Sequence, residues 1–108
     1  MNVIAEQLLF PEGPIAMPDG SIVLVEIARG TLSRVSSAGL VEVIAELGGG
    51  PNGAAIGPDG DCYVCNNGGM MFHRSSAGLL YPGSQPEDYM GGSIQRVNLN
   101  TGNFETLY

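Results

Sequence analysis

The sequence contains no lysine and no tryptophan, and its 108 residues include four basic residues against eleven acidic ones. The formal net charge is −7 at pH 7. Such a surface repels phosphate backbones and anionic lipids, so we expect no nucleic-acid partner. Long apolar runs are also missing. Ile22–Val25 is typical of those present and is far too short to cross a bilayer, so we expect no membrane partner.

The first residues of the chain also lack a targeting signal. Met1–Glu6 contain no basic residue, and an acid occurs within them. A secretory signal needs a positively charged region before its apolar stretch, so none is predicted here. We therefore expect a cytoplasmic protein.

Cysteine and histidine are scarce, which limits metal and redox chemistry. Cys62 and Cys65 form a C-x-x-C pattern, and His73 is the one histidine. A structural zinc site needs four ligands, and residues three apart on a strand point to opposite faces. Because the segment around these cysteines reads as a strand, we interpret them as ordinary strand residues. His73 has no nucleophile motif beside it, and we interpret it as a loop residue.

Glycine and proline, in contrast, are abundant. The chain has 17 Gly and 7 Pro, above the usual shares of roughly 7% and 5%. Its apolar content of 44% suits a folded protein. No segment carries a helical apolar period with good caps, because the nearest candidate, Gln7–Phe10, is ended by Pro11. The composition therefore predicts an all-β fold of short strands and tight turns.

An internal repeat organises the chain. Glu12–Gly20 aligns without a gap with Asn52–Gly60, and both segments end in Pro-Asp-Gly. This tripeptide is a turn signal, so we assign Asp19 and Asp59 to turn geometry rather than catalysis. Strands are then predicted over residues 21–27 and 61–66.

The second half of each repeat also matches. Gly30–Val35 aligns with Gly92–Val97, and a closing strand follows in each unit, over 40–47 and 103–108. The larger offset of this alignment places an insertion at residues 68–91 of the second unit. Each unit is thus four short strands, the size of a propeller blade.

The repeat predicts one domain, residues 1–108, built as part of a β-propeller. It has two four-stranded antiparallel blades, over about 12–47 and about 52–108. Propellers typically close with four to eight blades, so two cannot complete a ring. We expect C-terminal blades beyond this chain. Self-association is the alternative, since three copies would supply six blades.

Glu12 and Asn52 occupy equivalent positions in the repeat, just before the innermost strand of each blade. Innermost strands of a propeller line its central channel, so these two side chains should approach a common axis. Carboxylate and amide oxygens are ligands that Ca²⁺ accepts. The pattern favours an axial cation site, and the alternatives are an exposed acid at the strand entry for Glu12 and a turn residue for Asn52.

At these residues the chain resembles a known family. Phe10–Pro14 and Gly50–Ala54, each followed by Pro-Asp-Gly, are similar to the first two blades of the SMP-30/gluconolactonase/luciferin-regenerating family. The resemblance implies a six-bladed propeller that hydrolyses sugar lactones or related esters with a divalent metal. Ca²⁺ is the first expectation for that metal, with Zn²⁺ or Mn²⁺ as alternatives.

The resemblance also implies roles for particular residues. Glu12 matches the family's first metal-binding glutamate, and Asn52 matches an asparagine that contacts substrate in the channel. The other metal ligands and the catalytic base, an aspartate, come from later blades, so no catalytic residue is expected in this chain. Where family members often carry a basic residue, this chain has Gly50.

Asn66 and Asn67 follow the second strand of the second unit, where the insertion begins. Insertions in repeat proteins often lie on the binding face, so both are candidate substrate-binding residues. A loop start is the alternative reading. The apolar side chains of the insertion could form a lid or pack on their own blade: Met70, Met71, Phe72, Tyr81 and Tyr89.

Two other functions fit the same sequence. Strictosidine-synthase-like and paraoxonase-like enzymes share the propeller architecture. A propeller module without enzymatic activity, which binds a partner through its blade surfaces, is the second alternative.

Overall fold

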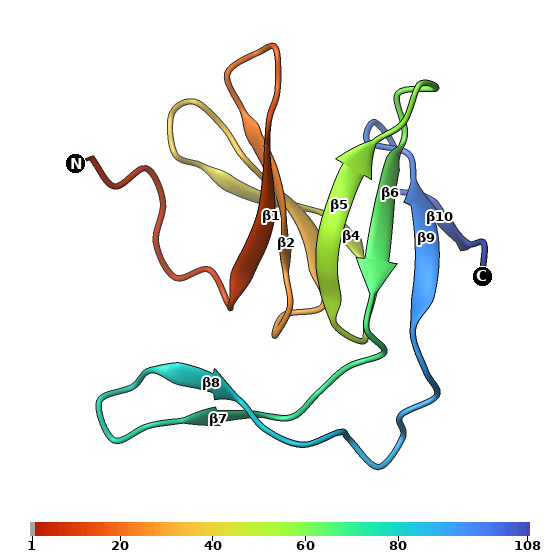
Figure 1. Ribbon diagram of the computed structural model, residues 1–108. Coiled ribbons are helices and arrows are strands. Elements are labelled where there is room, and N and C mark those ends of the chain that lie inside the picture. The colour runs from red at the N-terminus through yellow and green to blue at the C-terminus, as the bar shows by residue number, and fades with distance from the viewer. Residues whose placement is uncertain (1) are drawn as a thin grey trace.

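The structure, a computed structural model, describes residues 2–108, and this part of the chain forms ten β-strands and no helix (Figure 1). The all-β prediction is confirmed. With no helix among these residues, none of them forms a membrane-spanning helix.

Residues 11–46 form the N-terminal sheet. Its four strands lie in chain order and each pairs antiparallel with the next. The strands are β1 (Pro11–Ala16), β2 (Ile22–Glu26), β3 (Thr31–Val35) and β4 (Val41–Glu46). Consecutive strands pair because the connections between them are short turns, which favour an antiparallel meander.

The C-terminal sheet repeats this plan with one interruption. Its order is β5-β6-β9-β10, again antiparallel throughout. The strands are β5 (Pro51–Ile56), β6 (Cys62–Asn66), β9 (Ser93–Val97) and β10 (Phe104–Thr106). Every strand predicted from the repeat is present, and those given bounds end within one or two residues of the prediction. Glu12 and Asn52 were predicted just before the innermost strands and are instead the second residues of β1 and β5. The two predicted four-stranded antiparallel sheets are therefore confirmed.

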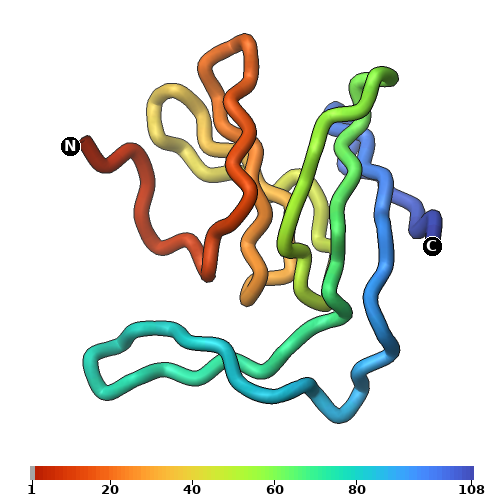
Figure 2. The backbone as a smooth tube through the Cα atoms, viewed as in Figure 1, coloured from red at the N-terminus to blue at the C-terminus, as the bar shows by residue number. Residues whose placement is uncertain are grey.

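The core lies between the two sheets, which stand side by side in Figure 2. The N-terminal sheet contributes Val23, Val25 and Leu32, all fully buried. The C-terminal sheet contributes Cys62, Val64 and Val97, also fully buried. Because alternate strand residues point to opposite faces, β2 and β6 each give this core every second side chain.

The two Pro-Asp-Gly turns have matching hydrogen bonds. The Asp19 carboxylate accepts from the Ser21 backbone nitrogen at 2.9 Å, and the Asp59 carboxylate accepts from the Asp61 nitrogen at 3.0 Å. Hydrogen bonding also lowers the pKa of both acids, chiefly from the Ser21 hydroxyl for Asp19 and from the Tyr63 hydroxyl for Asp59. Their assignment to turn geometry is confirmed.

The insertion contains a hairpin that the sequence did not predict. Strands β7 (Phe72–Arg74) and β8 (Leu80–Pro82) pair antiparallel and extend below the two sheets in Figure 1. The interpretation of His73 as a loop residue is wrong, because His73 pairs with Tyr81 inside this hairpin. A tight turn closes it, with the Ser75 nitrogen donating to the Leu79 carbonyl at 2.8 Å.

The packing predicts a large cost for Leu32→Ala. The side chain is fully buried between the sheets, so truncation leaves a cavity as well as losing apolar contact. We expect the free energy of unfolding to fall by about 2–5 kcal/mol, measured by chemical denaturation. Leu40→Ala, at a position 73% exposed, is the control and should change it by less than about 0.5 kcal/mol. Equal losses in the two variants would contradict this account of the core.

Candidate functional site

The first strands of the two sheets, β1 and β5, are neighbours across the seam between the sheets. The two backbones approach each other closely at Gly13. A Cβ atom added there would lie 3.4 Å from the Ala54 nitrogen and 3.5 Å from the Gly53 Cα. Gly13 also has a φ of +57°, which glycine adopts without strain. Glu12 and Asn52 directly precede these glycines, so the structure brings their two strand positions to the same level of the seam.

A β-bulge lies beside each of these positions, directly after Glu12 in β1 and at Asn52 in β5. In β1 the register shifts between Glu12 and Ile15, which leaves one extra residue opposite β2. In β5 it shifts between Pro51 and Gly53, so that Asn52 is the extra residue opposite β6. Bulges re-aim side chains and are frequent beside functional sites.

Glu12 and Asn52 are both exposed, so their oxygens are open to solvent or a ligand. Within residues 2–108, no three His, Cys, Asp or Glu side chains come together in an arrangement that could hold a metal ion. Ca²⁺ takes six to eight oxygen ligands. Glu12 and Asn52 alone therefore cannot supply the ligands of such an ion.

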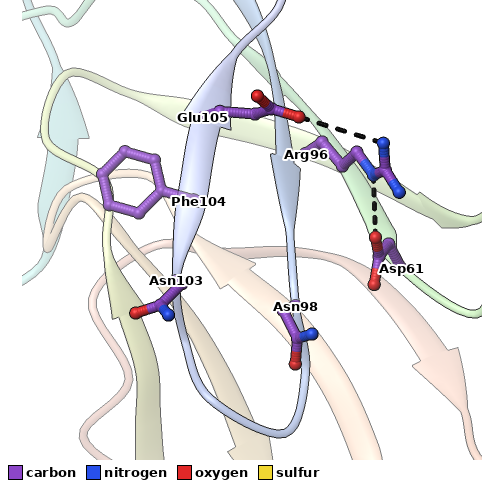
Figure 3. Close-up of a pocket in the computed structure, with 6 residues that line it drawn as sticks. All are labelled: Asp61, Arg96, Asn98, Asn103, Phe104 and Glu105. Carbon is purple, nitrogen blue, oxygen red and sulfur yellow. Dashed lines mark hydrogen bonds and ion pairs between the residues drawn. The ribbon is translucent and has the colours of Figure 1, made fainter.

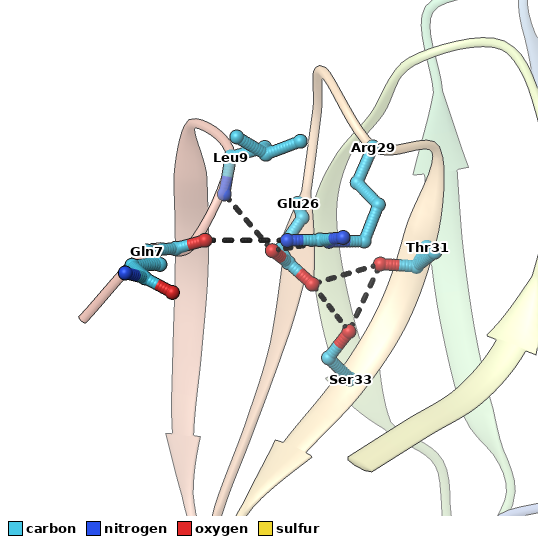
Figure 4. Close-up of polar contacts among 6 residues, drawn as sticks. All are labelled: Gln7, Leu9, Glu26, Arg29, Thr31 and Ser33. Carbon is cyan, nitrogen blue, oxygen red and sulfur yellow. Dashed lines mark hydrogen bonds and ion pairs between the residues drawn. The ribbon is translucent and has the colours of Figure 1, made fainter. Parts of the chain in front are cut away.

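A buried polar cluster, which the sequence did not predict, lies next to the start of β1 (Figure 4). At its centre is Glu26, the last residue of β2, whose side chain is fully buried. Its carboxylate accepts from the Leu9 backbone nitrogen at 2.9 Å, Arg29 Nε at 2.8 Å, Thr31 Oγ1 at 3.0 Å and Ser33 Oγ at 2.7 Å. Glu26 thereby joins the segment before β1 to the third strand of the sheet.

The pKa of Glu26 results from two opposing effects. Burial raises it, because a buried carboxylate loses its hydration. The hydrogen bonds from Ser33, Arg29, the Leu9 nitrogen and Thr31 favour the ionised form and together outweigh burial. The net pKa is lowered below the ordinary 4.5, so Glu26 is ionised at neutral pH.

Asn66 is the counterpart of Glu26 in the C-terminal sheet. Its Nδ2 donates to the Gly48 carbonyl at 2.9 Å and to Gln95 Oε1 at 3.0 Å. Its Oδ1 accepts from the Gly50 and Gly68 nitrogens, both at 2.9 Å. An asparagine side chain offers two donors and two acceptor sites, so the chain itself uses all of them. Asn66 thus serves the fold and presents no free group to a ligand.

Asn67, another predicted substrate-binding residue, lies beside the segment that leads into β5. Its nitrogen donates to the Gly50 carbonyl at 2.8 Å, and its Oδ1 accepts from the Gly69 nitrogen at 2.7 Å. A side chain at position 50 would require the Asn67 amide to move, because a Cβ there would overlap it. Asn67 therefore lies next to the start of β5, and it is half-buried whereas Asn66 is buried.

The two cysteines lie on opposite faces of β6, as predicted. Cys62 is buried in the core and Cys65 is exposed, and both are free thiols. Burial raises the pKa of Cys62 to about 11, so its thiol is protonated and unreactive at neutral pH.

A hollow of about 340 Å³ lies at the outer edge of the C-terminal sheet (Figure 3). Arg96 is its charged centre, with Nε 2.7 Å from Asp61 and Nη1 3.9 Å from Glu105. Its Nη2 lies 3.2 Å from Asp59, outside the hollow. The guanidinium charge is therefore already compensated. Since β10 is the edge strand opposite β5, the hollow is remote from Glu12 and Asn52.

Comparison with known proteins adds no family assignment. No family model matches the chain. A search of curated proteins also finds no match.

The Glu26 cluster predicts a pH-dependent contribution to stability. A lowered pKa in the folded state means that the contribution is present above pH 4.5 and is lost as the pH falls through the folded-state pKa. In Glu26→Gln we expect the free energy of unfolding at pH 7 to fall by about 1–3 kcal/mol. We also expect the free energy of unfolding of this variant to decrease less steeply than that of the wild type when the pH is lowered from 6 to 3. Chemical denaturation at several pH values measures both. Glu46→Gln, an exposed acid on β4, should keep the wild-type profile.

The hydrogen bonds of Asn66 predict a contribution to the free energy of unfolding that does not depend on pH. Asn66→Ala leaves the Gly48 carbonyl and the Gly50 nitrogen without their partner, so we expect a loss of about 1–3 kcal/mol in the free energy of unfolding. The loss should be the same at pH 5 and pH 8. Asn100→Ala, in an exposed turn, is the control, and wild-type stability in Asn66→Ala would remove the structural role.

Proposed function

We propose that this chain supplies the first two blades of a β-propeller enzyme that hydrolyses sugar lactones or related esters with a divalent cation, Ca²⁺ before Zn²⁺ or Mn²⁺. The observation that carries the proposal is that Glu12 and Asn52 lie near the starts of neighbouring first strands, with a bulge directly after Glu12 and another at Asn52. Two sheets from different parts of the chain thereby bring a carboxylate and an amide to one seam. The family resemblance of the same residues supports the choice of reaction.

The proposed roles of the two residues follow from the carboxylate of Glu12 and the amide of Asn52. Glu12 would hold the cation, and Asn52 would hold substrate or water beside it. A divalent cation polarises a carbonyl group and orients water. The proton of that water has to be taken by a base that neither residue supplies, so the complete site includes side chains from further blades. In this proposal Asn66 supports the start of β5 and does not bind substrate.

A non-enzymatic interaction module is the second candidate, and one observation favours it. The hairpin insertion exposes apolar side chains, with Met90 96% exposed and Leu79 69% exposed. A contact surface requires apolar groups that form one contiguous patch, and this candidate requires that these side chains do so. Partner binding through them would survive chelators, whereas binding at the Glu12 seam would not.

The proposal predicts weak cation binding that depends on Glu12. Isothermal titration with CaCl₂, then with Zn²⁺ and Mn²⁺ salts, should show binding that falls about tenfold or more in Glu12→Gln, because a direct ligand is lost. Glu46→Gln removes the same charge from exposed β4 and should bind like the wild type. If the two variants bind alike, Glu12 is not part of a cation site.

A further inference from the structure

Residues 3–6 repeat the sequence of the outermost strand of the N-terminal sheet. They read Val-Ile-Ala-Glu and are identical to residues 43–46, which lie in β4. The two segments are 40 residues apart, which is also the separation of Glu12 and Asn52, so the repeat runs without a gap over residues 3–20. Because β4 is the fourth strand of its sheet, the alignment assigns residues 3–6 to the same place in another sheet.

The two segments also make the same contact with the sheet that follows each of them. β4 lies against the turn between β9 and β10, where a side chain at Gly102 would overlap the Ile44 carbonyl. Residues 3–6 lie against the turn between β3 and β4, where a side chain at Gly39 would overlap the Ile4 carbonyl. Both glycines have a left-handed φ, +84° for Gly39 and +77° for Gly102. Ile4 and Ile44, equivalent in the repeat, therefore have equivalent neighbours.

The chain leaves both segments along the same path. The Ile27 nitrogen donates to the Phe10 carbonyl at 3.0 Å, and the Asn67 nitrogen donates to the Gly50 carbonyl at 2.8 Å. The donors of these two bonds are equivalent in the repeat, and so are the acceptors. Figure 1 shows residues 2–9 on the side of the N-terminal sheet that is turned away from the C-terminal sheet, which we call the far face.

The far face has the composition of a face that packs against a sheet. Leu24 and Val35 correspond in the repeat to Val64 and Val97, which form part of the core between the two sheets. Leu24 is 6% exposed and Val35 is 3% exposed. The N-terminal sheet therefore offers, on its far face, the same kind of apolar surface that the C-terminal sheet uses to pack against it.

The partner of β4 shows which strand should pair with residues 3–6. β4 pairs antiparallel with β3, the third strand of its sheet, and Val43 lies opposite Ser33. Among residues 2–108 there are two such third strands, and both are already paired on that side, β3 with β4 and β9 with β10. The counterpart for residues 3–6 therefore belongs to a further sheet.

We propose that residues 3–6 form the outermost strand of a further four-stranded sheet on the far face, paired antiparallel with the third strand of that sheet. The other three strands belong to the same polypeptide and form the last of the further blades that the proposed function requires. The pairing closes the ring, because the last blade is completed by residues that precede the first. This inference rests on the blades of the proposed function and does not depend on its hydrolase reaction.

Photo-cross-linking in the protein expressed from its complete reading frame tests the pairing. With p-benzoylphenylalanine in place of Val3, irradiation should join position 3 to a segment of the same polypeptide outside residues 1–108. That segment should align with the two known third strands, Thr31–Val35 and Ser93–Val97. The same photoprobe at Val43 is the matched control and should cross-link to Ser33.

Hydrogen exchange in the same protein provides a second measurement. Residues 3–6 should exchange at a rate comparable to that of residues 43–46, since both are hydrogen-bonded outer strands. Gly39→Ala should raise the exchange rate of residues 3–6 more than that of residues 43–46, because the new methyl group overlaps the Ile4 carbonyl. Gly60→Ala introduces alanine at the similar φ of +85° with no atom within 4 Å of the new Cβ, so it should leave both rates unchanged.

Three results would overturn the proposal. In the first, position 3 cross-links only within residues 1–108 or only to another polypeptide. In the second, it forms no cross-link although the Val43 control does. In the third, residues 3–6 exchange as fast as an unpaired segment. Failure of the cation site is a separate outcome, because Glu12→Gln removes a proposed ligand and leaves residues 3–6 unchanged.

Discussion

Each sheet depends on one buried polar side chain that joins the end of its second strand to the segment leading into its first. In the N-terminal sheet Glu26 accepts from the Leu9 nitrogen, and in the C-terminal sheet Asn66 accepts from the Gly50 nitrogen. Backbone hydrogen bonds reinforce both, from Ile27 to the Phe10 carbonyl and from Asn67 to the Gly50 carbonyl. Because a buried backbone group without a partner is costly, these contacts decide where β1 and β5 begin. The positions of Glu12 and Asn52 follow from them.

The two sheets meet this requirement with different chemistry. Glu26 is a buried anion, so it needs hydroxyl groups and the Arg29 guanidinium to replace its hydration. Asn66 is neutral and completes its bonding with Gln95 and backbone groups. Phe10, between Leu9 and β1, has a φ of +59°, a conformation that residues other than glycine seldom adopt. Hydrogen bonds lie on both sides of it, from the Leu9 nitrogen to Glu26 and from the Ile27 nitrogen to the Phe10 carbonyl.

The sequence predicted the strands well because the information is local. Strands such as β2 and β6 are recognisable from the Pro-Asp-Gly turn before them and from their own residues. The repeat then indicated which strands belong to the same sheet. The buried cluster was missed because its contacts join distant residues, with Leu9 bonded to Glu26 and Asn66 to Gln95. The alignment that pairs Glu12 with Asn52 also pairs Glu26 with Asn66. These two polar residues at equivalent strand ends were the signal from which the buried contacts could have been predicted. For the candidate site, the sequence predicted only that Glu12 and Asn52 occupy equivalent places in the two sheets. Further ligands could not be predicted, because the described residues bring no group of acidic, histidine or cysteine side chains together there.

The bulges after Glu12 and at Asn52 also separate two requirements that an unbroken strand would couple. In a regular strand, inserting or deleting one residue moves every later side chain to the opposite face. Here the extra residue lies near the start of each strand, so the alternation restarts before Ile15 and Ala54, which pack against the core. The exposed side chains of Glu12 and Asn52 could therefore change during evolution without altering the register of either sheet.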